Sequence, residues 1–170
     1  MAQRIRIEVR LPEGHWAGDV TRSCPSGILR IEEHMPLSRR KGMARCWSDI
    51  DMSKVIEQHD GVESLHMLSN QHFSVDILAG GGGFLKPLRQ AGVVPRTPFD
   101  VRDGWVEWSI ESSKEVLKEL FRSLDQEGIP YPVTVYATEL ESITHHTSIG
   151  SLPVCAAKGV LRCTSHDNAD

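Results

Sequence analysis

Four consecutive glycines, Gly80 to Gly83, are the residues whose type and spacing most directly suggest binding chemistry. They stand between an alternating apolar stretch and a short helical pattern, so they predict a strand-to-helix turn. Backbone N–H groups in such a turn can point at an anion, helped by the helix N-terminus that follows. Gly80, Gly81, Gly82 and Gly83 are therefore candidate ligand-binding residues for a small carboxylate or phosphate. A flexible turn that merely needs small residues is the alternative, because a lone glycine run is a weak signal.

A basic turn, Ser38 to Lys41, places three consecutive cations at the expected tip of a hairpin. Cations at such a tip can bind phosphate, although a solvated surface turn is the commoner outcome. Trp105 and Trp108 fall on opposite faces of one predicted strand, so one is expected in the core and the other at an interface.

No group of residues with a catalytic arrangement emerges, and we expect no enzyme. The histidines are scattered among different predicted elements, and each is interpreted as a surface or half-buried residue: His15, His34, His59, His66 and His72. Glu32 and Glu33 point to opposite faces of a strand, which argues against a shared acid–base site. Cys24 and Cys46 are interpreted as core thiols, because a nucleophile needs a nearby base that spacing cannot show.

The tail after residue 140 collects further cysteines and histidines without a recognisable metal-binding spacing. Cys155 and Cys163 lie eight positions apart, and His145, His146 and His166 are not at zinc-finger intervals from them. We therefore predict neither a metal site nor a cofactor. The tail also lacks helical or strand periodicity, so we expect 141–170 to be irregular or disordered.

The elements that must position these residues follow the same order in both halves of the chain. Alternating apolar residues predict strands over 4–11, 28–35, 43–47 and 62–68, with helices over 14–24 and 51–58. The second half predicts strands over 72–78, 93–101, 105–110 and 131–137, with helices over 84–90 and 112–127. Strand–helix–strand–strand–helix–strand is the order of ferredoxin-like domains.

Several local signals sharpen these elements. Pro95 and Pro98 interrupt the second strand of the second half, 93–101, which makes it an expected edge strand. Ser112 and Glu115 have the spacing of a capping box at the start of the longest helix. Gly61 is expected to supply a left-handed helix cap, and Asp103-Gly104 a tight hairpin turn.

The fold class predicted is α+β: tandem ferredoxin-like (βαββαβ) repeats over 1–69 and 70–140, with mostly antiparallel sheets. The same order occurs in small regulatory ligand-binding domains of the ACT type, a likeness at the level of fold alone. Domains this small bury little core, so we expect the two repeats to pack together or the chain to form a homodimer.

Composition excludes several classes of protein. The chain has 170 residues, 39% hydrophobic and 25% charged, with a net charge of −4, which rules out collagen-like, coiled-coil and wholly disordered proteins. Such a charge shows no overall footprint of nucleic-acid binding. Without an apolar run of about 20 residues, no membrane span is expected. Four cysteines without CxxC spacing favour a reducing, cytoplasmic setting.

Residues 1 to about 140 resemble the N-terminal region of archaeal helix-turn-helix regulators of the bacterio-opsin activator type. The stretch that carries the resemblance reads AGVVPRTPFDVRDGWVEWSI, followed by a capped helix with LKELFRSLDQEGI and then a strand. In that family a C-terminal helix-turn-helix follows, with an LT…Q segment and a GYYDVPR-like motif. That domain is not evident in this sequence.

The tail offers an explanation for the missing helix-turn-helix. With suitable codons, the residues from Val160 to Ala169 read, one base later, as Tyr-Tyr-Asp-Val-Pro-Arg-Thr-Ile-Thr-Leu, which is the motif of the family. Our hypothesis is that 141–170 is an out-of-frame translation of the DNA-binding domain. Its cysteines and histidines would then be accidental.

The resemblance implies the sensory and dimerisation region of a DNA-binding transcription regulator, without a working DNA-binding domain of its own. DNA would be contacted only through the C-terminal domain of the family. A small-molecule effector and a second copy of the chain are the expected partners. The alternative is a stand-alone ACT-like module that binds a small molecule and regulates an enzyme.

Overall fold

The computed structural model describes residues 2–83, 85–132 and 135–139. Its strands are β1 Ala2–Arg10, β2 Leu29–Pro36, β3 Gly42–Ser48, β4 Val62–Met67, β5 His72–Ile77, β6 Phe99–Arg102, β7 Trp105–Ser113 and β8 Val135–Glu139. Its helices are α1 Trp16–Ser23, α2 Ser53–Glu57, α3 Lys86–Ala91 and α4 Lys114–Gln126, with a short 3-10 turn η1 at Ser38–Arg40. The tail at 141–170, and every prediction made for it, lies outside the described residues.

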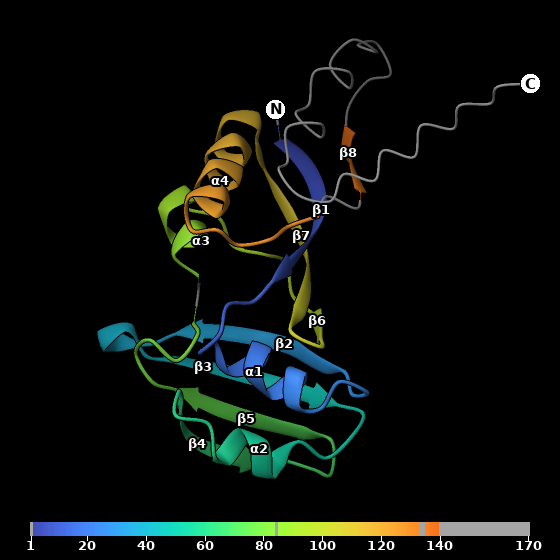
Figure 1. The fold of residues 1–170 in the computed structure, drawn as a ribbon, viewed down its shortest axis with the longest axis vertical. Helices are drawn as coiled ribbons and strands as arrows, with labels where there is room; N and C mark the ends of the chain where they lie inside the picture. The colour runs from blue at the N-terminus through green and yellow to red at the C-terminus, as the bar shows by residue number, and fades with distance from the viewer. Residues whose placement is uncertain (1, 84, 133–134, 140–170) are drawn as a thin grey trace, which may run out of the picture.

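The described strands form one open antiparallel sheet in the order β4-β5-β3-β2-β6-β7-β1-β8. Strands β2 to β5 occupy one end, where α1 and α2 cover them, and β1 and β7 rise from that end toward α3 and α4 (Figure 1). Strand β6 joins the two ends by pairing with β2 on one side and β7 on the other. The α+β class and the antiparallel sheet are confirmed.

The sheet does not show tandem ferredoxin-like repeats. Strand β1 stands at the start of the first predicted repeat, yet it pairs with β7 and β8 of the second. Its place beside β3 is taken by β5, which the sequence assigned to the second repeat. The exchange has a physical basis, because β1 and β7 align buried residues opposite one another, Ile5 with Ile110 and Ile7 with Trp108. The division at residues 69 and 70 stays a prediction.

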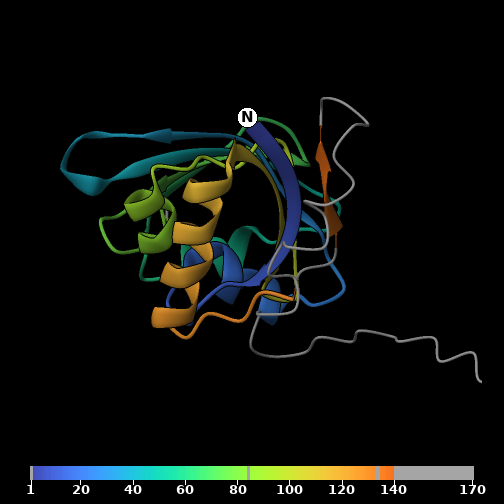
Figure 2. The same cartoon turned by 90° about the horizontal axis from the view of Figure 1, so that it is seen from above.

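One hydrophobic core runs along the helix-covered face of the sheet. Helix α4, which falls within the helix predicted over 112–127, contributes an apolar stripe with Leu117, Leu120 and Leu124 buried. Figure 2 shows α3 and α4 side by side against the curve of β7 and β1. On β7, Trp108 is buried in this core and Trp105 is half-buried, as expected of alternate faces.

Three local predictions need correction. Strand β6 is not an edge strand, and the proline-interrupted stretch before it forms no strand. The cap of α4 is Ser113 rather than Ser112, and its side chain accepts a hydrogen bond from the Val116 N–H at 3.3 Å. Gly61 does not have the predicted left-handed backbone. A glycine is required at this position because a Cβ atom would lie 2.6 Å from the Cα atom of Gly81.

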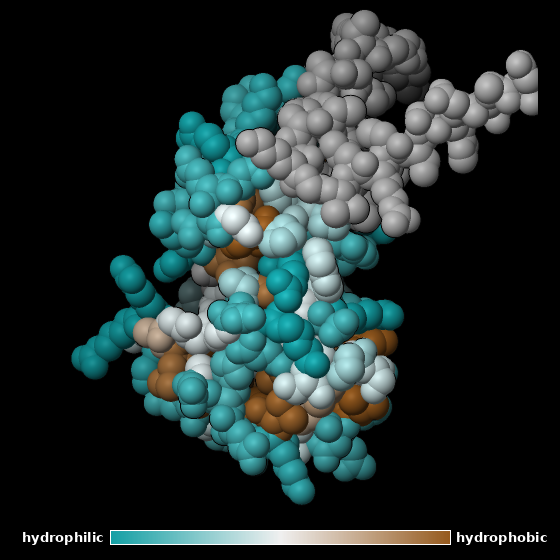
Figure 3. Space-filling model, in the orientation of Figure 1, coloured by the Kyte–Doolittle hydropathy of each residue, from teal (hydrophilic) through white to brown (hydrophobic). Residues whose placement is uncertain are grey.

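Among the described residues, no helix is long and apolar enough to cross a membrane. Large apolar side chains still reach the surface at Met35, Leu37, Ile50, Met67, Leu68 and Val94. On the face drawn in Figure 3, hydrophilic residues predominate and the hydrophobic ones appear in separate patches.

Candidate functional site

A groove of about 400 Å³ opens between the β2–β3 hairpin tip, the glycine run and α3. The hairpin extends toward the side of the molecule where α3 lies, as Figures 1 and 2 both show. This volume falls within the range of small-molecule sites, roughly 300 to 1,000 Å³. The two binding features of the sequence, the glycine run and the basic turn, therefore border the same space.

The structure places three of the four predicted glycines, Gly80, Gly82 and Gly83, on the wall of this groove. Gly80 and Gly82 have φ angles of 83° and 107°, a backbone region in which only glycine is unstrained. Gly81 is buried instead, and a Cβ atom there would lie 2.2 Å from the carbonyl oxygen of Gly61. Its small size is therefore required by packing, as the alternative interpretation of the run expected.

The backbone of the run supplies potential donors to the groove. The Gly81 N–H is already used, because it donates to the Leu78 carbonyl at 2.9 Å. The N–H groups of Gly82 and Gly83 make no hydrogen bond within the described part of the chain. The sequence predicted that a helix N-terminus would follow the run and contribute to anion binding. This prediction is wrong, because α3 begins only at Lys86 and has six residues.

Four cationic side chains line the groove, and they come from two elements. The hairpin tip contributes Arg40 and Lys41, and α3 contributes Lys86 and Arg89. Glu13 is the single acidic residue among the described residues of the lining. Opposed by one carboxylate, these cations make the groove attractive to an anion.

The four cations differ in whether the protein already neutralises them. Lys41 lies 3.0 Å from a carboxylate oxygen of Glu63, and Lys86 lies 2.9 Å from one of Glu127. No such partner is found among the described residues for Arg40 or Arg89, and both are exposed. These two arginines therefore remain available to an anion in the groove, and guanidinium groups bind carboxylate and phosphate in a bidentate manner.

The backbone that carries Arg40 is in an unfavourable conformation. Arg39 and Arg40 have φ angles of 59° and 60°, in the left-handed region that costs an ordinary residue about 1 to 2 kcal/mol. Two consecutive left-handed residues correspond to the central positions of a type I′ hairpin turn, and the Lys41 N–H donates across this turn to the Ser38 carbonyl at 3.3 Å. Arg40 in this turn lines the groove, whereas Arg39 does not.

Two histidines form the inner wall of the groove, where β2 and the start of α1 meet the glycine run. Burial lowers the pKa of His15 to about 4, although a hydrogen bond with the Gly83 backbone acts in the opposite direction. Burial also lowers the pKa of His34. Both rings are therefore neutral at neutral pH, and the positive charge of the groove comes from its arginines and lysines.

The sequence did not identify the histidines or the α3 cations as site residues. His15 and His34 were interpreted as unrelated residues, and Lys86 and Arg89 were not singled out. They come together because β2, the start of α1 and α3 converge on the glycine run, and this convergence depends on the sheet order. The one signal in the sequence was that Lys86 lies three residues after Gly83 and is therefore close to the glycine run.

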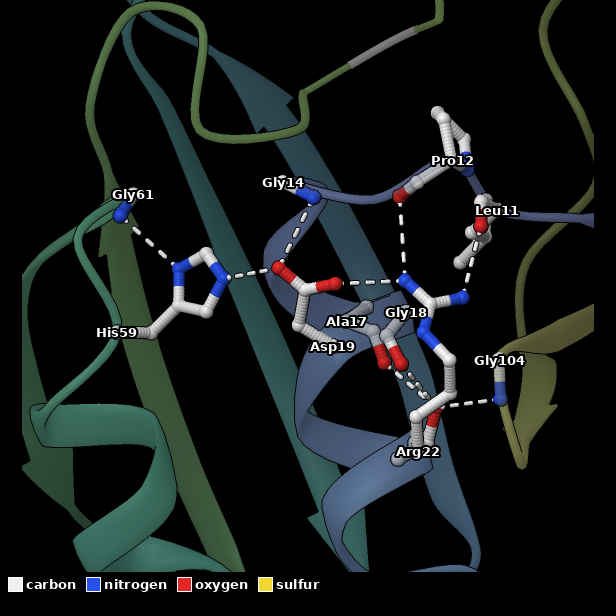
Figure 4. A network of polar contacts seen from close by, with 11 residues as sticks. Leu11, Pro12, Gly14, Ala17, Gly18, Asp19, Arg22, His59, Gly61 and Gly104 are labelled. Atoms are coloured by element: carbon white, nitrogen blue, oxygen red, sulfur yellow. Dashed lines mark hydrogen bonds and ion pairs between the residues drawn. The ribbon is translucent and has the colours of Figure 1, made fainter.

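A second polar cluster lies next to the glycine run and is drawn in Figure 4. Asp19 accepts hydrogen bonds from the Gly14 N–H at 3.0 Å, from Arg22 at 2.6 Å and from His59 Nε2 at 2.8 Å. His59 Nδ1 in turn accepts from the Gly61 N–H at 2.9 Å. Both ring nitrogens are thus occupied, so this histidine–aspartate pair has no free nitrogen with which to act as a base. We call this cluster the Asp19 network.

Cys46 is a free cysteine that the structure places in the core and away from the groove. Its thiol is buried in the sheet, and burial raises its pKa well above the ordinary range, which leaves it a core thiol as predicted. Cys24 is only partly buried and packs against the same core. Among the described residues, no three histidine, cysteine or acidic side chains come together as a metal site.

No family model matches the chain, and no curated protein matches it.

Proposed function

We propose that this chain is the sensory region of an archaeal transcription regulator related to bacterio-opsin activators, and that it binds a small anionic effector in the groove. The observation that carries the binding part is the pair of unneutralised arginines, Arg40 and Arg89, on either side of the glycine run. They approach from separate elements, so the anion would link the β2–β3 hairpin to α3. Effector binding would thereby change the freedom of one element relative to the other.

The binding part is tested by titrating the protein with inorganic phosphate and with citrate in isothermal calorimetry and thermal-shift assays. We expect Arg89→Ala to weaken binding about tenfold, as expected for loss of a charge-assisted hydrogen bond. Lys118→Ala is the matched control, because Lys118 is an exposed cation on α4 and does not line the groove. Equal affinities of the two variants, or no binding of either anion, would contradict the proposal.

The regulator part rests on the resemblance of residues 1 to about 140, and the gene can test it. If the codons from residue 141 onward encode the GYYDVPR-like motif in the plus-one frame, the tail is an out-of-frame remnant of the helix-turn-helix. In that case we expect the purified chain not to retain its own promoter DNA in a gel-shift assay at physiological salt. Sequence-specific retention would refute the proposal that it lacks a working DNA-binding domain.

A stand-alone ACT-like module that regulates an enzyme remains the second candidate, because the groove is complete without any DNA-binding domain. The single finding that favours it would be a gene in which codons 141–170 carry no such motif in another frame. Both candidates include self-association, which size-exclusion chromatography with light scattering measures directly. A monomer at micromolar concentration would remove dimerisation from either candidate.

A further inference from the structure

Behind the groove lies a small cavity of about 40 Å³ between the sheet and α1. It shares four lining residues with the groove, His15, His34, Gly82 and Gly83, so the two spaces adjoin at the histidine wall. A cavity of this size holds on the order of three water-sized groups. It is large enough for the end of a ligand and too small for a whole one.

The rest of the cavity wall is apolar, with one exception. Its lining consists mainly of core side chains, among them Leu11, Trp16, Ile31, Leu88, Phe99 and Val106. Trp108, which is only 4% exposed, also lines the cavity. Its Nε1 atom is buried and has no hydrogen-bond partner in the described part of the chain. A buried indole N–H is unfavourable when nothing accepts from it, so its presence next to a cavity calls for an acceptor.

The wall also contains an unused nitrogen of His15. Its Nδ1 is buried without a hydrogen-bond partner, although the ring hydrogen-bonds to the Gly83 backbone. Because that hydrogen bond favours the protonated ring, the ring donates in it, and the remaining nitrogen of the neutral ring can accept. The cavity therefore offers one donor, from Trp108, and one acceptor, from His15, in apolar surroundings.

We infer that the cavity receives the uncharged end of the groove ligand, a short apolar group with one carbonyl or hydroxyl oxygen that accepts from Trp108 Nε1. The inference rests on the proposed anion site, because the anionic end of the same molecule, carboxylate or phosphate, stays among Arg40, Lys41 and Arg89. A carbonyl uses the Trp108 donor alone, and a hydroxyl can also donate to His15 Nδ1. The ligand class is thus a small oxo- or hydroxy-substituted organic anion.

Matched ligand pairs test this inference on the unaltered protein. Levulinate and pentanoate differ by one ketone oxygen, and acetol phosphate and propyl phosphate form the corresponding phosphate pair. We expect the oxygenated member of at least one pair, or of its longer homologues, to bind about tenfold more tightly, the value of one hydrogen bond. The pair that shows the difference identifies the anionic group. Equal affinity within every pair and its homologues would overturn the inference.

The indole N–H of Trp108 provides a local readout. The chain has four tryptophans, and comparison with Trp108→Phe assigns the Trp108 indole signal in heteronuclear NMR spectra. We expect the oxygenated ligand to shift this signal and pentanoate not to shift it. Trp108→Phe should remove the preference between pair members, and Trp105→Phe on the opposite face of β7 serves as its control.

The two proposals fail in different ways. If pentanoate and propyl phosphate bind and Arg89→Ala weakens both, the anion site stands even when the ketone oxygen has no effect. If no anion binds at all, the proposed function fails together with the inference. If oxygenated ligands bind tightly and Arg89→Ala changes nothing, the cavity is occupied by a molecule that the groove cations do not hold.

Discussion

The groove and the Asp19 network border the same glycine run, and they differ in how completely their polar groups are used. In the network, the Asp19 carboxylate has three donors and His59 uses both ring nitrogens. Arg22 also donates to the carbonyls of Leu11 and Pro12. In the groove, Arg40 and Arg89 lack partners within the described residues, and so does Trp108 Nε1 in the adjoining cavity. Because a satisfied network stabilises a structure and an unsatisfied one needs something to complete it, the comparison separates framework from site.

The glycine run itself allows the strongest test of this separation. Gly81→Ala should destabilise the protein by about 3 kcal/mol, because its methyl group meets the Gly61 backbone and neither segment can move easily. Gly83→Ala should change stability by less than about 0.5 kcal/mol, since a Cβ atom there has no neighbour within 4 Å. Urea unfolding measures both. Similar losses for the two variants would mean that the run is not divided between packing and binding.

The pH dependence of stability tests whether His15, beside the glycine run, is buried as a neutral ring. Burial holds the pKa of His15 at about 4, whereas an unfolded histidine has a pKa near 6.5. As the pH falls from about 6.5 toward about 4, the unfolded chain therefore gains a proton that the folded chain does not, and stability falls by about 3 kcal/mol. His15→Phe should flatten this part of the stability curve, measured by urea unfolding at a series of pH values. An unchanged curve would show that His15 is not buried as a neutral ring.

The sequence could predict those features of the structure that depend on neighbouring residues in the chain. Residues that act within one element were predictable: the stripe on α4, the alternation in β1 and the Asp103-Gly104 turn all follow from local period or turn chemistry. The sequence also identified the glycine run as a candidate site, and the structure places Gly80, Gly82 and Gly83 at a groove, while their binding role stays a prediction.

What the sequence could not predict depends on strand order. Both halves have the same element order, and nothing local shows that β1 pairs with β7 rather than within its own half. The residues that line the groove were therefore not predictable either, because Arg89 and His34 lie near the glycine run only as a result of this strand order. Gly61 shows the same limit on a smaller scale, since its need to be small arises from Gly81, which is 20 positions away in the sequence.

The Asp19 network should behave as framework. Asp19→Asn should lower the free energy of unfolding by about 1.5 kcal/mol at neutral pH, because an amide oxygen accepts more weakly than the carboxylate. Burial raises the pKa of Asp19, but hydrogen bonds from His59, Arg22 and Gly14 outweigh it and hold the pKa below its ordinary value. The stabilisation is therefore complete above about pH 4 and is lost as the pH falls through the lower pKa of the folded state.

Two measurements check that assignment. The stability difference between Asp19→Asn and the unaltered protein should shrink in acid, and the exposed Asp60→Asn should show no such difference at any pH. Anion binding in the groove should survive Asp19→Asn. A variant that folds fully and yet no longer binds phosphate would place Asp19 in the site and break the distinction.

The smallest expected effect concerns the tip of the β2–β3 hairpin, where one left-handed residue lines the groove and its neighbour does not. Replacing Arg39 or Arg40 by glycine relieves a left-handed conformation, and we expect each variant to gain about 0.5 kcal/mol, because the greater freedom of glycine in the unfolded chain offsets part of the relief. Only Arg40 lines the groove, so Arg40→Gly alone should weaken phosphate binding. A gain in stability joined to a loss of binding would show that the hairpin holds Arg40 in place for a ligand at the expense of stability. If both variants bind phosphate as the unaltered protein does, the strain serves the turn and not the site.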